Sequence, residues 1–287
     1  MREPFAAWID RDVVRASGPD AVAFLQGQLS QDVESLAIGH STWSLLLQPS
    51  GKVDSWLRVT REAQDVMVLD VDGGWGDALV ARLARFKLRT KCDLEPVDGW
   101  RGVAVRNATL APSDAGDAGN GVAHCLPIVW PGTDGYDLLG LDVEPPTGVA
   151  ISDPSAATYE RARIEAGVPA LGHELTEATI PVEAGQWLID ASVSFTKGCF
   201  TGQELVARID SRGGSAPRPV RGLRIAGAVV RGDEIVRGGD TIGSLTSAAE
   251  TDDGSTVALA PLSRTVALGS DVEVAGQAGR VVALPMA

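Results

Sequence analysis

The segment KGCFTGQE, residues 197–204, contains two structural signals next to each other. Thr201 and Glu204 have the spacing of a capping box, in which each side chain bonds the backbone of the other, so a helix is predicted to start at Thr201. The two glycines of the segment permit tight turns and a close approach of backbone to another group. Cys199 therefore lies just before a predicted helix N-terminus.

This position predicts a reactive thiol. Free backbone N–H groups and the positive end of the helix dipole favour a thiolate over a thiol, and Lys197 adds a nearby cation. We therefore predict that Cys199 is the reactive group and that Lys197 assists it. The alternative is that Cys199 is a small buried hydrophobic residue, which is common for a single cysteine.

The segment resembles the K-G-C-F/Y-x-G-Q-E signature of the YgfZ family. These are folate-binding proteins related to the aminomethyltransferase, or T-protein, of the glycine cleavage system, and they include factors that assemble or repair iron–sulphur clusters. The resemblance continues in three further blocks: FLQGQLSQDV at 24–33, WSLLLQPSGKVDSWLRV at 43–59 and RARIEAGVPALGHELTEATIPVEAGQW at 161–187. Together with the C-terminal barrel domain of the family, it covers nearly the whole chain, with a break at 107–121.

The resemblance implies a folate site. In folate-binding relatives the Glu of a P-x-E motif contacts the pterin ring, and here that residue is Glu183. A carboxylate can accept two parallel N–H bonds from such a ring. The resemblance implies tetrahydrofolate as the cofactor, with further contacts from Gln28, Trp187, Gln203 and Arg208. Two alternatives stay open: the Gln28 amide caps local backbone, and Trp187 is a core residue.

One block departs from the aminomethyltransferases. Their strand reads close to G-x-I-D-D-L, and an Asp of this motif assists aminomethyl transfer. Here Ser55 and Trp56 stand where the Asp pair would be, and Asp54 lies one residue earlier. A shift of one residue turns a strand side chain to the other face of its sheet. We therefore expect no aminomethyl transfer by the T-protein mechanism.

A run of basic residues stands out in an acidic chain. The net charge is −13, from 25 basic and 38 acidic residues, yet no acid falls between Asp77 and Asp93. The predicted helix from Asp77 to Leu88 and the residues after it contain Arg82, Arg85, Lys87, Arg89 and Lys91. We predict that this run holds the anionic polyglutamate tail of a folate. The alternative is a solvated helix face.

Composition excludes several classes of protein. The acidic balance argues against binding to nucleic acid or to an anionic membrane surface, which need basic patches. No apolar run approaches the roughly 20 residues of a membrane span, and the charged start is unlike a signal peptide. Cys92, Cys125 and Cys199 are far apart, so no disulfide framework or metal site is predicted. We expect a cytoplasmic monomer.

The chain is long enough for two or three domains. We predict an α+β fold with a strand at 7–16, a helix from residue 21, strands at 43–47 and 53–59, and a helix from 153 to 166. Regular short strands between Gly-rich turns predict an antiparallel β-barrel at 220–287. The resemblance implies that residues 1–210 form a folate-binding region around a central channel. In this region, about 1–45 together with 150–210 would interleave with 46–149.

Two functions follow as expectations. The first is a tetrahydrofolate-binding accessory factor for assembly or repair of iron–sulphur proteins, whose partners would be folate and cluster or client proteins. The second is a folate-dependent aminomethyl- or methyl-transferase. The departure at Ser55 and Trp56 favours the first, so we do not expect a T-protein-like enzyme.

Overall fold

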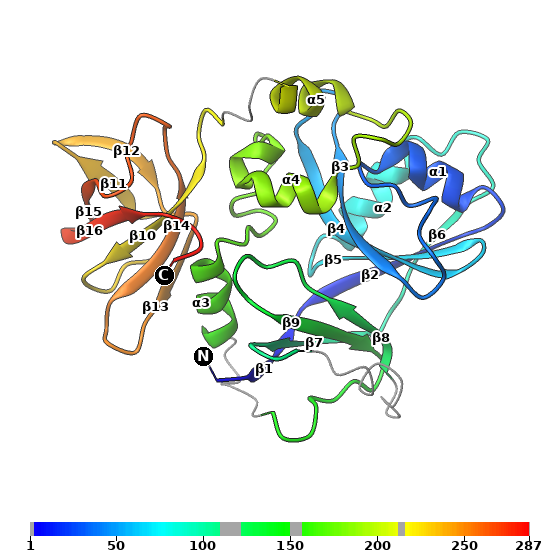
Figure 1. Ribbon diagram of the computed structural model, residues 1–287, viewed down its shortest axis with the longest axis horizontal. Helices are drawn as coiled ribbons and strands as arrows, with labels where there is room; N and C mark the ends of the chain where they lie inside the picture. The colour runs from blue at the N-terminus through cyan, green and yellow to red at the C-terminus, as the bar shows by residue number, and fades with distance from the viewer. Residues whose placement is uncertain (1–2, 110–121, 150–156, 212–215, 287) are drawn as a thin grey trace.

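The computed structural model describes residues 3–109, 122–149, 157–211 and 216–286 (Figure 1). Within these ranges the chain forms three antiparallel sheets and five α-helices, a mixed α/β architecture. No helix in the described ranges is long and apolar enough to cross a membrane. Two sheets pack close to one another on one side of the molecule, and the C-terminal sheet stands beside them, next to helix α3 (Figure 1).

The first sheet has five strands in the order β3-β4-β5-β2-β6. These strands are β2 (Arg11–Ser17), β3 (Ser41–Leu47), β4 (Val53–Ala63), β5 (Val66–Asp72) and β6 (Asp93–Pro96). The predicted hairpin is confirmed: β3 pairs with β4, and Gly51 supplies a positive φ of 79° in the turn between them. Helices α1 (Ala21–Gln28) and α2 (Gly76–Ala84) pack on this sheet.

The second sheet has four strands in the order β1-β7-β9-β8. They are β1 (Phe5–Ile9), β7 (Arg101–Arg106), β8 (Val122–Pro127) and β9 (Gly135–Gly140). The prediction of a single strand at 7–16 is therefore wrong, because Asp10 separates two strands, β1 and β2. β1 pairs with β7 and β2 with β5, so adjacent strands enter different sheets. The direct passage from β1 to β2 therefore holds the two sheets next to each other.

The remaining helical elements follow the second sheet. They are α3 (Ala157–Ala166), the 3₁₀ helix η1 (Pro181–Ala184), α4 (Gln186–Ser192) and α5 (Gln203–Ser211). The predicted start of α3 at Asp153 lies outside the described residues, and its end is confirmed at Gly167, whose φ is 74°. α5 begins at Gln203, two residues after the predicted start at Thr201, and Gln203 Oε1 accepts the N–H of Phe200, three residues earlier, at 3.2 Å. α2 ends at Ala84, four residues before the predicted Leu88.

The C-terminal segment forms a seven-stranded antiparallel sheet in the order β12-β11-β15-β16-β10-β14-β13. Its strands are β10 (Val220–Ile225), β11 (Glu234–Arg237), β12 (Asp240–Ser244), β13 (Ser247–Glu250), β14 (Thr256–Pro261), β15 (Asp271–Val274) and β16 (Gln277–Val282). The predicted antiparallel strands are thus confirmed. The two outer strands, β12 and β13, do not pair within the described residues, so the sheet is a half-barrel.

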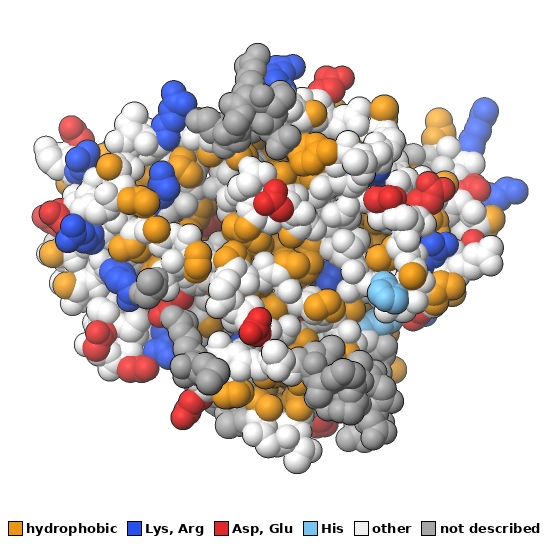
Figure 2. Space-filling view, viewed as in Figure 1, with side chains coloured by type: hydrophobic (Ala, Val, Ile, Leu, Met, Phe, Trp, Pro, Cys, Tyr) orange, Lys and Arg blue, Asp and Glu red, His pale blue; other side chains and the backbone are white. Residues whose placement is uncertain are grey.

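Separate apolar cores hold these parts together. The largest core covers the five-stranded sheet and includes Leu25, Leu45 and Leu69, each with no exposed surface. Burying such a side chain contributes about 1.5–3 kcal/mol. A smaller cluster joins Ile164 of α3 to Val257 of the C-terminal sheet, so α3 is the connecting helix. On the face in Figure 2, charged side chains of both signs are scattered around a middle region rich in hydrophobic side chains.

The predicted division of residues 1–210 into interleaved subdomains stays a prediction. The boundary placed near residue 45 falls inside β3, which pairs with β4 on the other side of it. The sheets themselves do interleave in sequence, because β1 joins strands from residues 101–140 while β2 joins strands from residues 41–96.

Candidate functional site

A central cavity of about 380 Å³ lies where the two N-terminal sheets meet α3 and the segment 168–173. Five of the seven tryptophans of the chain line it: Trp8, Trp43, Trp56, Trp75 and Trp130. Tyr159 adds a sixth aromatic ring. Cavities lined by aromatic rings and a few polar groups are typical sites for small ligands, and flat walls of this kind favour a flat ring.

The tryptophans are held in a stack. Trp43 and Trp56 lie face to face with ring centroids 4.3 Å apart, and Trp187 meets Trp56 edge-on at 5.8 Å. Trp56 Nε1 donates a hydrogen bond to Ser192 Oγ at 2.9 Å, which fixes its ring. The buried Trp43 Nε1 has no hydrogen-bond partner among the described residues. Trp43, which lines the cavity, thus has a buried N–H donor without a partner.

A series of buried arginines and aspartates, here called the charge chain, lies beside these rings. Asp70 accepts hydrogen bonds from Arg11 and from Arg58, both at 3.0 Å or less. Asp137 accepts from Arg58 at 3.0 Å and from Arg106 at 2.8 Å. Burial alone would raise the pKa of each carboxyl, but the guanidinium groups hold the pKa of Asp70 and of Asp137 below the ordinary value. Both carboxylates are therefore charged, and the chain links the two sheets.

Arg106 is the residue of the charge chain that lies nearest to an aromatic ring of the cavity. Its guanidinium lies 4.1 Å from the Trp130 ring centroid and 5.3 Å from that of Tyr159. Nη1 donates to Asp137 and to two backbone carbonyls, whereas the buried Nε has no partner within the described ranges. Two unpartnered donors, Arg106 Nε and Trp43 Nε1, thus belong to residues that line one cavity. Unpaired buried donors are rare and suggest a missing acceptor.

A second polar cluster joins this wall to the C-terminal sheet. The Glu174 carboxylate accepts hydrogen bonds from Ser247 Oγ at 2.7 Å and from Arg163 Nη1 at 3.3 Å. Ser247 Oγ is also 2.7 Å from Arg163 Nη2 and 3.1 Å from His173 Nδ1. Arg231 donates to His173 Nε2 at 2.7 Å. Because Nε2 accepts and Nδ1 donates, His173 is neutral in this arrangement.

We expect acid to weaken this cluster. Burial lowers the pKa of His173 below the ordinary value of 6.5. The unfolded chain therefore takes up the proton at higher pH than the folded chain, so the free energy of unfolding falls as pH drops through and below about 6.5. His173→Gln removes the titrating group and is expected to reduce this slope in urea titrations between about pH 7 and pH 5.

His40→Gln provides the control, because it makes the same substitution at an exposed position. Burial also lowers the pKa of His124. His124 therefore contributes to the pH dependence of the free energy of unfolding in the unaltered protein and in both variants. An equal slope in the His173→Gln and His40→Gln proteins would show that His173 is protonated alike in the folded and unfolded states.

Lys197 has a defined structural role. Its ammonium donates to the backbone carbonyls of Gln26 at 2.6 Å, Leu29 at 2.8 Å and Gln31 at 2.9 Å. These groups lie at the C-terminal end of α1, where a cation is favourable. Burial lowers the pKa of Lys197 to about 8. Since an ammonium has three donors and all are used, Lys197 fastens the motif loop to α1.

Cys199 is exposed in the loop between Lys197 and α5. Its neighbour Thr201 is tied to Gly27 by a backbone hydrogen bond of 3.2 Å, so the loop stays beside α1. Cys92, by contrast, is buried, and burial raises the pKa of its thiol. The exposed position of Cys199 suits reaction with a partner, but its reactivity stays a prediction.

The other predicted site residues lie around this loop or on the elements next to it. Gln203 shares a surface cavity of about 330 Å³ with Lys197, and its amide oxygen is engaged by the Phe200 N–H. Arg208 is exposed further along α5. Gln28 lies on α1, and its buried Oε1 has no partner in the described part of the chain. None of these three residues lines the central cavity.

Glu183 lies in η1 and also does not line the central cavity. Its Oε2 accepts the Ile180 N–H at 3.2 Å, and burial raises the pKa of its carboxyl. Trp187, at the start of α4, reaches the cavity only through its edge contact with Trp56. The proposed pterin contact of Glu183 therefore stays a prediction, and its carboxyl already interacts with the backbone of Ile180 and of Arg218.

The residues at the predicted departure face different sides of β4. Trp56 lines the central cavity, whereas Ser55 lines another cavity next to α2. Asp54 pairs with Arg82. No carboxylate from these three positions lines the central cavity.

The sequence did not predict Arg11, Arg58 or Arg106, which stand beside Asp70 and Asp137 in the central charge chain. A signal was present, because Arg58 and Asp70 each interrupt a run of apolar strand residues, Leu57 to Val59 and Leu69 to Val71. A charge at such a position must be buried with a partner, but the sequence does not identify the partner.

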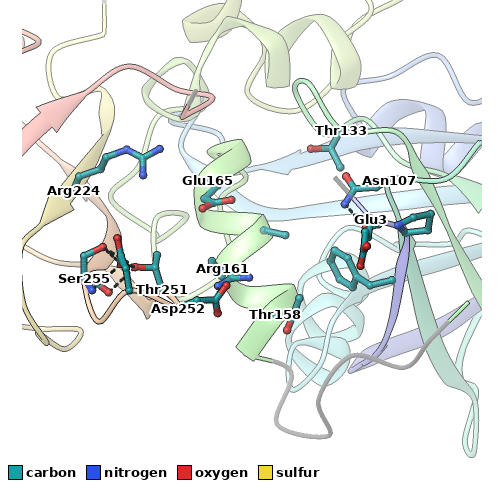
Figure 3. A pocket seen from close by; sticks show the side chains of 14 residues that line it. Glu3, Asn107, Thr133, Thr158, Arg161, Glu165, Arg224, Thr251, Asp252 and Ser255 are labelled. Atoms are coloured by element: carbon teal, nitrogen blue, oxygen red, sulfur yellow. Dashed lines mark hydrogen bonds and ion pairs between the residues drawn. The ribbon is translucent and has the colours of Figure 1, made fainter. Parts of the chain in front are cut away.

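The largest described cavity, about 770 Å³, lies between α3, β1 and the β13–β14 turn (Figure 3). Three of its charged groups are already engaged. Arg161 forms an ion pair with Asp252 at 2.8 Å, and Asp253 accepts hydrogen bonds from the Thr251 and Ser255 side chains. This cavity also lacks the aromatic wall of the central one, so we take the central cavity as the candidate site.

No family model matches the chain. The chain is similar to the tRNA-modifying protein YgfZ of Edwardsiella ictaluri, with 28% identity over 217 residues that cover 70% of this chain and 65% of that protein. It is also similar to a mitochondrial iron-sulfur cluster assembly factor IBA57 homolog of Pyricularia oryzae. That identity is 27% over 223 residues, covering 73% of this chain and 54% of the relative. The match thus spans less than two thirds of either relative.

The chain also has the fold of a solved structure. It matches the glycine cleavage system aminomethyltransferase T from Bartonella henselae with a TM-score of 0.72, covering 98% of this chain and 86% of that one at 22% identity. An identity this low shows the fold alone, and it confirms the T-protein-like fold expected from the sequence. The chain is a distant homologue of the YgfZ/IBA57 family and has the fold of the aminomethyltransferase T-protein.

Proposed function

We propose that this protein is a tetrahydrofolate-binding accessory factor for assembly or repair of iron–sulphur proteins, and that the central cavity binds the folate ring. The observation that carries the proposal is the cavity itself: five tryptophans surround it, and two of its residues hold unpartnered buried donors. When bound, a reduced folate supplies a carrier of one-carbon groups.

The cavity suits a pterin in shape and polarity. A pterin is flat, so it can stack on indole rings, and its carbonyl oxygen and ring nitrogens accept hydrogen bonds. Trp43 Nε1 and Arg106 Nε are the donors available for these acceptors. The carboxylates of Asp70 and Asp137 are committed to arginines, and Asp137 would serve to hold Arg106 in place.

Cys199 is the proposed reactive group toward a client protein. An exposed thiol on a surface loop can meet a protein partner, which a buried one cannot. Lys197 would act by positioning that loop on α1, with Gln203 beside it and Gln28, Arg208, Glu183 and Trp187 on neighbouring elements. The names of the relatives support a role with iron–sulphur proteins.

The name of one relative refers to tRNA modification. A net charge of −13 argues against direct RNA binding by this chain, because RNA affinity depends on basic surface. A link to tRNA would therefore pass through a client enzyme. We further propose a cytoplasmic monomer, in which the interleaved region before residue 210 surrounds a folate channel and the C-terminal half-barrel forms a separate domain.

The alternative function is a folate-dependent aminomethyl- or methyl-transferase, which the T-protein-like fold favours. The observation against it is Trp56, an aromatic side chain in the cavity where the aminomethyltransferase motif places a carboxylate. Tryptophan cannot accept a proton as a carboxylate does.

Trp8→Ala tests the site. Trp8 is only partly buried and lines the cavity, so its removal takes away a stacking surface without opening the main core. Calorimetric titration with tetrahydrofolate is expected to show affinity about five- to tenfold weaker, as for loss of an aromatic contact. Trp100→Ala is the matched control, since Trp100 contacts His124 and lies outside the cavity lining.

Glu183→Gln extends the same titration. A loss of affinity confined to Glu183→Gln, with Trp8→Ala unchanged, would place the ring at η1 instead of the central cavity. Equal affinity in the unaltered protein and the three variants would show that folate binds neither in the central cavity nor at η1.

A further inference from the structure

A separate cavity of about 280 Å³ lies on the opposite face of β4 from the central site. Ser55 and Trp56 are consecutive strand residues, so their side chains point to opposite faces. Trp56 lines the central cavity and Ser55 lines the second one, between β4 and α2. We call this space the α2 cavity. Its walls are mostly apolar, with Leu46, Leu79 and Leu175 among them.

Two residues of the α2 cavity carry buried polar atoms without partners. Ser55 is 4% exposed, and its Oγ has no hydrogen bond within the described residues. Arg82 Nη1 is likewise buried and unpartnered. The rest of the Arg82 guanidinium is fixed, because Nε binds the Asp54 carboxylate and Nη2 donates to the Leu47 carbonyl at 2.7 Å. A hydroxyl and a guanidinium N–H are therefore held ready without an acceptor.

The charges around the α2 cavity indicate what the acceptor is. Asp54 already balances Arg82, so only the exposed Arg85 at the rim adds positive charge, and the exposed Glu177 adds a negative one. These four charges cancel, so the lining disfavours a dianion such as phosphate, and a single carboxylate would be held by hydrogen bonds from Arg82 and Ser55. Two oxygens of one carboxylate can accept from Arg82 and Ser55 together, while the apolar walls take an apolar body.

We propose that the α2 cavity binds the carboxylate group of an amphipathic ligand through Arg82 and Ser55. Two sources share this chemistry: a free small organic acid, and a glutamyl carboxylate of a folate whose ring occupies the central cavity. Trp75 lines both cavities, so a tail leaving the central cavity would pass this ring. The second source rests on the proposed folate site, and the first does not.

The rest of the basic run does not contribute. Lys87 lies 3.8 Å from Asp93, beyond the end of α2, and Arg89 and Lys91 are exposed residues that do not line the cavity. The expectation that five basic residues act together is thus narrowed here to Arg82, with Arg85 at the rim.

Titration with benzoate, followed by calorimetry or by ligand-observed NMR, tests the free-acid source. Benzoate is expected to bind and benzamide, its neutral counterpart, is expected not to. Ser55→Ala should weaken benzoate about three- to tenfold without lowering the melting temperature, because it deletes an unpartnered hydroxyl. Ala81→Leu should abolish binding by filling the cavity, while Ala84→Leu, on the same helix but outside the lining, should not.

Monoglutamyl and triglutamyl tetrahydrofolate test the tail. If the tail is the ligand, the triglutamyl form binds more tightly and loses that advantage in Ala81→Leu, whereas the monoglutamyl form is unaffected. Benzoate binding does not depend on folate binding. A protein that binds benzoate but no folate would therefore contradict the proposed function and leave the α2 cavity proposal standing. The proposal is overturned if benzamide binds as well as benzoate, or if neither benzoate nor the tail responds to Ser55→Ala and Ala81→Leu.

Discussion

Replacing Arg58 by alanine is expected to lower the free energy of unfolding by about 3–5 kcal/mol, the cost of breaking a buried ion pair by removing one partner. Arg58 has no exposed side-chain surface and donates to Asp70 and Asp137, each at 3.0 Å. Without it Asp70 keeps Arg11 and Asp137 keeps Arg106, but each carboxylate loses a charged partner in a place that water does not reach. This is a large share of the 5–15 kcal/mol that stabilises a typical domain.

Urea denaturation measures the effect directly. Arg161→Ala is the matched control, because its partner Asp252 is 93% exposed and such surface pairs contribute about 0–1 kcal/mol. Arg58→Lys, which keeps the charge but not the fork of donors, should fall between the two. A loss below about 1 kcal/mol for Arg58→Ala would mean that the charge chain does not join the two sheets as described.

Replacing Cys199 by alanine is expected to abolish restoration of iron–sulphur enzyme activity in cells that lack the protein. The same variant should fold and bind tetrahydrofolate like the unaltered chain, because Cys199 is exposed and lies outside the central cavity. An exposed substitution of this size changes stability by about 0.5 kcal/mol or less. Loss of function with intact folding and binding would assign the chemistry to the thiol.

Three comparisons make this test selective. Thr201→Ala, two residues along the same loop, should restore activity fully. Cys199→Ser keeps the size of the side chain and should fail like alanine. Iodoacetamide should label Cys199 before Cys92, whose thiol is buried. Full restoration by Cys199→Ala would refute the role of this cysteine.

Local patterns in the sequence predicted much of the fold. The hairpin around Gly51, the end of α3 at Gly167 and the C-terminal strands follow from turn residues and period-two patterns, which act over a few neighbours. The failure at residues 7–16 has a physical reason. Asp10 lies between two good strand segments, and only the pairing of each with a distant partner, β7 or β5, shows that they separate.

The candidate site was less accessible from sequence. Motifs identified the loop of Cys199 and Lys197, but not that the Lys197 ammonium would be used up by the α1 carbonyls. The central cavity draws its walls from β1, β3, β4, β7 and α3, and no single segment carries its pattern. Charges inside apolar strands, such as Arg58 and Asp70, indicated buried partners, but only the packing of two sheets brings Arg58 to Asp137.

A crystal structure of the protein with bound tetrahydrofolate tests the central claim most directly. We predict a pterin ring in the central cavity, stacked on its tryptophans, with acceptors within hydrogen-bond distance of Trp43 Nε1 and Arg106 Nε. A ring bound at η1 against Glu183, or a central cavity left without ligand at saturating tetrahydrofolate, would contradict the account.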